Sequence, residues 1–237
     1  MNRSSVTRLQ QIIAACVLTM IAAPAAAQVP PASGPGDDEP RAPYSRWSLG
    51  VVSGAQDVSR TGITAGGAIS VRLRTFVHLA IESGRMSDVV TSSRRTELDS
   101  YAAYIRDAYR VPATAEIEGP TLYGLAGLTF MPDGKPAGES SGIRPYITVT
   151  AGVARVEYKP AFVVDGQPIS GAGALVYNVA IGRDLMGTTN RFAYGGGAGI
   201  VFGDTWSLDL GARILRIHTT DHPTTVKRLV IGLGRRF

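Results

Sequence analysis

Along most of this chain, apolar side chains alternate with small or polar ones. One run places Trp206, Leu208, Leu210, Ala212 and Ile214 between Ser207, Asp209, Gly211 and Arg213. Successive side chains of a strand point to opposite faces, so a period of two predicts a strand with one apolar and one polar face. This period dominates from residue 46 onward and predicts an all-β fold.

The pattern divides into separate strands joined by connections of unequal length. Most strands are close to the roughly 9–11 residues that a tilted strand needs to cross a bilayer. Short connections alternate with long ones, of which 87–118 and 157–191 are the longest. Such alternation is typical of an up-and-down barrel with different surroundings at its two ends. The predicted strands are 46–54, 62–73, 75–86, 119–131, 144–156, 192–203, 205–217 and 226–237.

The N-terminal 27 residues are typical of a secretory signal peptide. Two arginines precede a short apolar run, IIAACVLTMIAA, and small residues end at Ala27, so we expect cleavage after Ala27. Cleavage removes Cys16, the only cysteine of the chain. We expect residues 28–44, which are rich in Pro and Gly, to form a flexible periplasmic leader, and residues 45–237 to form the barrel.

An alternating β-domain can place its apolar face inward, as soluble proteins do, or outward into lipid. Export, the absence of a long apolar helical run, and charged residues on the polar face favour the outward arrangement. Eight strands leave a lumen that side chains can fill, and buried charges must be paired. We therefore expect a polar network inside the barrel, formed by Arg72, Glu82, Asp209 and Arg213.

Aromatic residues gather at one end of the predicted strands. An even number of strands puts both chain ends on the periplasmic side, and aromatic rings prefer the membrane interface. Strict alternation turns Phe76 and Tyr146 to the lumen, unless bulges shift them. The predicted periplasmic girdle consists of Trp47, Phe130, Phe202, Trp206 and Phe237.

Four stretches of the chain carry a resemblance to a known family. They are HLAIESG (78–84), RPYITVTAGVARV (144–156), YGGGAGIVFGDTWSLDLGAR (194–213) and the terminal LVIGLGRRF. The chain resembles the small outer-membrane β-barrel proteins of Gram-negative bacteria, the eight-stranded, porin-like superfamily. This resemblance implies an eight-stranded antiparallel transmembrane barrel and contact with outer-membrane lipids and lipopolysaccharide. A final Phe also implies recognition by the barrel-assembly machinery, although Arg235 stands where relatives commonly have an aromatic residue.

The function that we expect is structural, or interaction at the cell surface, by a monomer with a filled lumen and no wide pore. The sequence predicts no catalytic residues, metal site or cofactor. The net charge of +5 includes no dense basic block, so we expect no nucleic-acid partner. Two alternatives stay open: a lipid hydrolase that uses the His218–His222 loop, and a soluble periplasmic barrel that binds an apolar ligand.

The long loops carry two further predictions. In loop 87–118, Thr96 and Asp99 form a capping-box pattern, and apolar residues at helical spacing follow until Pro112. The alternative is that the flanking strands extend beyond the membrane. The arginines at 94, 95, 183 and 191 belong to a solvated loop or contact lipopolysaccharide phosphates.

Overall fold

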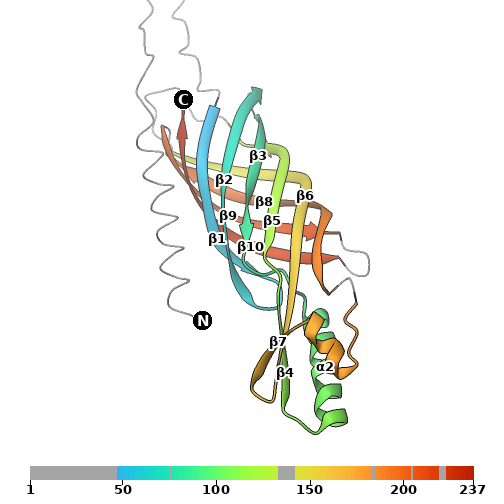
Figure 1. Ribbon diagram of the computed structural model, residues 1–237. Coiled ribbons are helices and arrows are strands. Elements are labelled where there is room, and N and C mark those ends of the chain that lie inside the picture. Colours follow the sequence, from blue (N-terminus) through green and yellow to red (C-terminus); the bar gives the residue numbers. More distant parts are fainter. Residues whose placement is uncertain (1–46, 75, 133–141, 183–184, 204, 219–222) are drawn as a thin grey trace, which may run out of the picture. The chain divides into compact units, whose positions relative to one another are not determined.

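The computed structural model describes residues 47–237, except for 75, 133–141, 183–184, 204 and 219–222 (Figure 1). All described residues lie in one compact unit, Ser45–Phe237. The predicted signal peptide, its cleavage site at Ala27 and the predicted leader lie outside the described residues.

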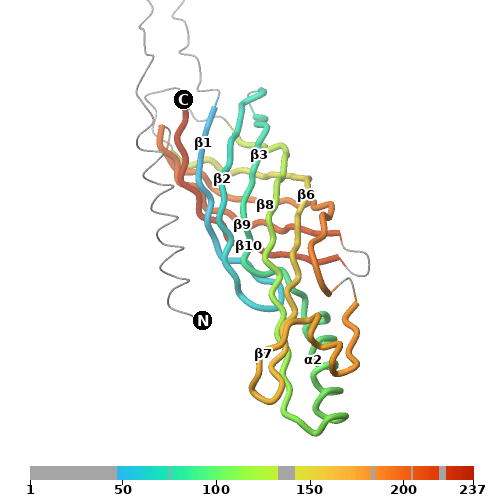
Figure 2. Tube along the Cα trace, in the orientation of Figure 1, coloured from blue at the N-terminus to red at the C-terminus, as the bar shows by residue number. Residues whose placement is uncertain are grey.

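Eight antiparallel strands follow one another around a closed ring, in which β1 also pairs with β10. The trace in Figure 2 shows the last strand beside the first. Closure leaves no free sheet edge in the ring, as a barrel in lipid requires. The predicted all-β, eight-stranded, up-and-down fold is therefore confirmed. The ring strands are β1 (Trp47–Asp57), β2 (Thr61–Arg74), β3 (Val77–Met86), β5 (Thr121–Phe130), β6 (Ile143–Val164), β8 (Gly187–Phe202), β9 (Trp206–Ile217) and β10 (Thr224–Arg236).

The apolar face of the ring points outward. Large apolar side chains are exposed on every strand, whereas charged side chains such as Glu82 and Arg228 are buried inside. A soluble barrel would show the reverse arrangement, because water and lipid favour opposite faces. Exposed members of this apolar belt include Leu49, Ile69, Ile81, Leu128, Val149, Ile200, Leu210, Ile214, Ile231 and Leu233.

The height of the apolar belt matches a bilayer. On β9, ten residues separate Trp206 at one edge from Arg216 at the other. Ten residues also separate Phe237 from Lys227 near the same two edges. At about 3.3 Å per residue and a tilt of about 40°, ten residues rise roughly 25 Å, the height of the apolar band in outer-membrane barrels.

A distal module projects from the end of the ring opposite to residues 47 and 237 (Figure 1). We define it as the part of β6 after Val156 together with four further elements. Two of these, β4 and β7, pair with the extended β6 on opposite sides. The four elements are α2 (Ser92–Tyr109), β4 (Ala113–Glu118), β7 (Gln167–Ser170) and the 3₁₀ helix η1 (Ala172–Tyr177).

The helix predicted in loop 87–118 is present as α2, but it begins earlier than the capping-box pattern indicated. Thr91 is the N-cap, and its Oγ1 accepts a hydrogen bond from the N–H of Arg94 at 3.4 Å. The pattern at Thr96 therefore lies inside the helix. Arg110 ends α2 in the left-handed conformation, with φ of 58°.

Burial explains how the module is held on the ring. The inward face of α2 buries Leu98, Ala102 and Ile105, and these belong to the same apolar cluster as Leu125 and Leu215. One continuous apolar core therefore fills the module and the adjoining half of the lumen.

Candidate functional site

Glu82 is the centre of a charged layer inside the barrel. Its period-two position on β3 turns it inward, where only 5% of the residue is exposed. Arg213 pairs with its Oε2, and Arg228 Nη1 donates to Oε1 at 2.9 Å. The Tyr123 hydroxyl donates to Oε1 at 2.8 Å. The carboxylate is thus neutralised by cations from β9 and β10.

A second carboxylate extends this layer along β9. Arg213 Nη2 lies 3.2 Å from Asp209 Oδ2, and it donates to the Tyr146 hydroxyl at 3.5 Å. A Cβ added at Gly199 or Gly211 would come within 2.6 Å or 2.5 Å of the Tyr146 hydroxyl. The Tyr146 side chain therefore occupies space that only glycine leaves free at these two positions of β8 and β9.

The structure brings together three of the four residues of the predicted network, Glu82, Asp209 and Arg213. Arg72 lies near the end of β2, where its Nε donates to the carbonyl oxygen of Arg74 at 3.4 Å. Arg228 supplies the second cation of Glu82, and sequence reasoning missed it. Its signal was available in the alternation of β10, because Arg228 has the same parity as Val230, which is buried in the lumen.

The lumen is closed on the distal side of the charged layer. Apolar side chains pack this half together with buried polar residues such as Gln56, Thr64 and Thr224. The apolar residues, each at most 2% exposed, are Met86, Leu125, Ala154, Ala193, Leu215, Ile217 and Val226. On the other side, a cavity of about 140 Å³ is lined by residues that include Ser70, His78, Thr129 and Asp209. The cavity ends at the charged layer, so the lumen holds side chains rather than a continuous channel.

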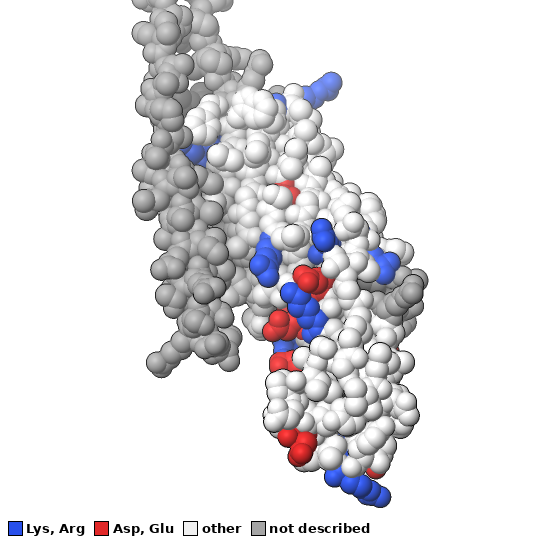
Figure 3. Space-filling model, viewed as in Figure 1, with Lys and Arg blue, Asp and Glu red and all other residues white. Residues whose placement is uncertain are grey.

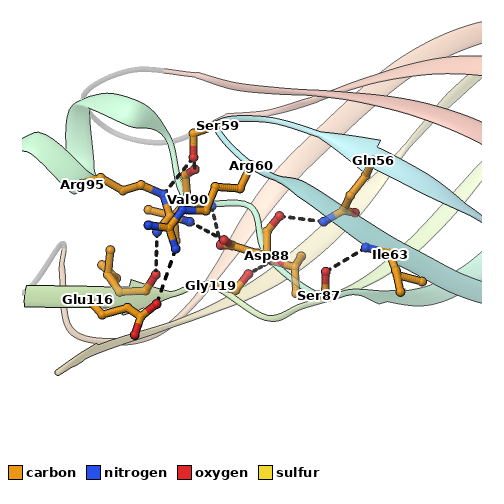
Figure 4. Close-up of polar contacts among 12 residues, drawn as sticks. Gln56, Ser59, Arg60, Ile63, Ser87, Asp88, Val90, Arg95, Glu116 and Gly119 are labelled. Carbon is orange, nitrogen blue, oxygen red and sulfur yellow. Dashed lines mark hydrogen bonds and ion pairs between the residues drawn. The ribbon is translucent and has the colours of Figure 1, made fainter. Parts of the chain in front are cut away.

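A polar junction joins the distal module to the ring (Figure 4). Arg95 donates from Nε to Ser59 Oγ at 2.9 Å and from Nη1 to the carbonyl oxygen of Ile117 at 3.2 Å, and it also pairs with Asp88. One guanidinium thus links the β1–β2 turn, the segment after β3, and β4. Gln56 Nε2 adds a hydrogen bond to the carbonyl oxygen of Asp88 at 2.6 Å.

Two of the loop arginines, Arg94 and Arg95, make contacts within the protein. The Arg95 side chain is only 14% exposed, so its role is structural rather than that of a solvated loop residue. The guanidinium carbon of Arg94 lies over the ring of Tyr158, 4.5 Å from its centroid. Arg183 lies outside the described residues.

The predicted aromatic girdle lies around the rim where β1 begins and β10 ends. Trp47, Phe130, Trp206 and Phe237 are between 45% and 58% exposed, and Phe202 is half-buried. The N–H of Phe237 donates to the carbonyl oxygen of Trp47 at 3.0 Å, and this bond closes the ring at its last residue.

Tyr146 and Phe76, which strict alternation turns to the lumen, lie on different sides of the barrel wall. Tyr146 is interior, as alternation predicts. Phe76 precedes β3 and is 59% exposed. The register of β2 against β3 shifts between Arg72 and Arg74, so alternation does not carry through this turn.

His218 is exposed at the end of β9, whereas residues 219–222 of the proposed catalytic loop lie outside the described residues. Across the described ranges, no group of three or more His, Cys, Asp or Glu side chains is arranged to hold a metal ion. No helix in the described ranges has both the length and the apolar character to cross a membrane.

Solved structures of outer-membrane proteins are similar to this chain at low sequence identity. Neisserial surface protein A (NspA) is 11% identical, with a TM-score of 0.47, over 81% of this chain and 97% of that chain. The attachment invasion locus protein Ail of Yersinia pestis is 13% identical, with a TM-score of 0.42, over the same shares. The outer membrane enzyme PagL is 14% identical, with a TM-score of 0.38, over 80% and 99%. No curated protein matches the chain in sequence.

The family comparison covers nearly the whole chain. The family described as outer membrane protein beta-barrel domain matches residues 13–237, which include the ring, the charged layer and the distal module. The closed ring and its outward apolar belt are what a barrel in lipid requires. The chain therefore belongs to the outer membrane protein beta-barrel domain family.

Proposed function

We propose that this protein is a monomeric outer-membrane barrel with a closed lumen that holds the distal module at the cell surface as an interaction element. The observation that carries the proposal is the combination of an outward apolar belt with a lumen that is filled by side chains. In this proposal, the chain enters the periplasm with a signal peptide that is cleaved after Ala27, and residues 28–44 remain there as a leader.

The two ends of the barrel support this orientation. In outer-membrane barrels the short turns are periplasmic and the longer loops extracellular. Here the turn between β8 and β9 comprises only residues 203–205, whereas the connections that carry α2 and η1 belong to the opposite end. The aromatic rim is then periplasmic, and Phe237 is positioned for recognition by the barrel-assembly machinery.

The distal module supports a role in interaction in addition to a structural role. Its η1 helix exposes Leu175 and Val176, which are 62% and 80% exposed. Adjacent apolar side chains that stay exposed on a well-packed unit are suited to a contact surface. We propose no catalytic residue, because Glu82 and Asp209 pair with the arginines of the charged layer, as structural ion pairs do.

Fractionation tests the proposed location. We expect the protein to stay with the outer membrane after a carbonate wash and to migrate faster on gels when unheated, because the closed ring resists detergent. Release into the periplasmic fraction would favour the soluble, ligand-binding barrel instead. Unchanged lipid composition after gene deletion would count against the lipid-hydrolase alternative.

A further inference from the structure

We propose that Arg85, Leu122 and Arg155 form a binding site on the outer wall of the barrel for the phosphate group of a membrane lipid. This inference rests on the proposed function, since it requires the belt to lie in a bilayer with the distal module outside. It adds to that function the residues that recognise the lipid phosphate.

The register brings the three side chains into one row. Arg85 on β3 pairs with Leu122 on β5, and Leu122 pairs with Arg155 on β6. All three are exposed on the outer face. Neighbouring strands lie about 4.8 Å apart, so the two arginine backbones are roughly 10 Å apart with the leucine between them. Two arginine side chains can therefore converge on one phosphate above Leu122.

Nearby carboxylates leave these two guanidinium groups to an external anion. Glu157, two positions from Arg155 on β6, lies 3.3 Å from Lys159. Across the residues that the structure describes, neither Arg85 nor Arg155 forms an ion pair. The residues that continue the row are Ala65 and Asn190, which carry no charge.

The row also lies at the level where lipid phosphates are expected. Figure 3 shows charged side chains gathered in a band between the barrel wall and the distal module, whereas the wall itself is almost free of charge. Below the row on β5, Gly124 and Ala126 face outward, and a Cβ added at Gly124 would meet nothing within 4 Å. An acyl chain can thus lie along β5 while its phosphate meets the two arginines, whose planar forks match phosphate oxygens.

A second basic pair at the same edge of the belt is less suited to this role and provides a matched control. Arg216 on β9 and Lys227 on β10 are diagonal neighbours, since Arg216 pairs with Thr225 and Lys227 with Ile214. The other register partner of Lys227 is Asp57, whose carboxylate competes with an anion. One member of this pair is also a lysine, which cannot bind phosphate with a planar fork.

The test compares lipid retention by native mass spectrometry of the full-length protein in detergent. The probes are phosphatidic acid and phosphatidylcholine with identical acyl chains, and inorganic phosphate is added in a parallel sample. We expect the wild type to retain phosphatidic acid preferentially, and Arg85→Gln/Arg155→Gln to weaken that retention on the order of 10- to 30-fold, as expected for two basic side chains near an anionic headgroup. Arg216→Gln/Lys227→Gln removes the same charge and should change it much less.

A third variant tests the acyl position without removing charge. Gly124→Phe adds bulk where the outer wall is open, so we expect the ring to form and phosphatidic acid retention to fall. Equal losses in the two double variants would overturn the site in favour of a general basic band. Full competition by inorganic phosphate would overturn recognition of a lipid. Normal outer-membrane fractionation with no preference for phosphatidic acid would reject this site alone, whereas release of the wild type into the periplasm would reject the proposed function.

Discussion

At the scale of single residues, Glu82 has the largest expected effect on stability. Replacing it with Gln keeps the shape of the side chain but leaves Arg228 without a carboxylate inside the barrel and Arg213 with Asp209 alone. Breaking a buried pair in this way costs about 3–5 kcal/mol. We expect Glu82→Gln to lower the free energy of unfolding by that amount, measured by urea unfolding of the protein folded into vesicles.

The control for this prediction is Glu157→Gln. Glu157 pairs with Lys159, but both side chains are about half exposed. Exposed pairs contribute about 0–1 kcal/mol, so this substitution should change the free energy of unfolding little. Equal effects of the two substitutions would mean that the charged layer does not stabilise the barrel.

The second residue-scale prediction separates lipid from water on the outer face. Ile231 is 57% exposed near the middle of the belt on β10. In a bilayer, Ile231→Arg should cost about 2–4 kcal/mol, whereas Thr225→Arg, on the same face near the distal edge, should cost about 0–1 kcal/mol. In water, substitutions at exposed positions usually stay within about 0.5 kcal/mol.

The same vesicle unfolding experiment measures this difference. A cost that depends on depth along β10 supports a lipid-facing wall. Two small and equal costs would support the soluble barrel, which the sequence alone did not exclude.

At the scale of elements, α2 is held on the module by its buried face. Ile105 is fully buried, and Tyr104 beside it is 49% exposed. We expect Ile105→Ala to lower the free energy of local unfolding by about 2–5 kcal/mol, because truncation of a buried side chain leaves a cavity. Trypsin should then cleave the folded protein faster after Arg106, which lies in the last turn of α2.

Tyr104→Ala is the matched variant, and its cleavage rate should stay near that of the wild type. The heat-modifiable migration of both variants should be unchanged, because α2 is not part of the ring. If Ile105→Ala also abolished that migration, the ring and the module would unfold as one unit.

Strand β6 is longer than the alternation of its sequence predicted. We predicted that β6 ends at Val156, but it continues to Val164 with the same alternation of buried and exposed residues. Lys159 and Pro160 resemble a loop in sequence, since proline lacks a backbone N–H. The strand continues because β4 and β7 pair with it, and the carbonyl oxygen of Pro160 accepts from the N–H of Gly171 at 3.1 Å.

At the scale of the whole molecule, the closed lumen predicts poor conduction. The apolar half and the charged layer lie in series along the barrel. We expect the purified protein to give no large, stable conductance in planar bilayers, because eight strands leave no open channel once side chains fill the lumen. A wide porin in the same bilayer is the positive control, and a stable conductance of similar size would overturn the filled lumen.

What the sequence determined by itself was the period of its strands and therefore the fold class. The alternation at Trp206–Ile214 or Leu229–Leu233 follows from local geometry, in which neighbouring side chains point to opposite faces. The preference of lipid for the apolar face then identified the inside and the outside, and with them the inward positions of Glu82, Asp209 and Arg213.

What only the tertiary structure decided was which distant residues meet. Arg228 reaches Glu82 across 146 positions of sequence, and Arg95 reaches Ser59 across 36. The extension of β6 likewise depends on partners elsewhere in the chain. Such contacts depend on the register and the curvature of the closed ring. Local alternation carries no information about either, because shifting a strand by two residues leaves every side chain on the same face of the sheet.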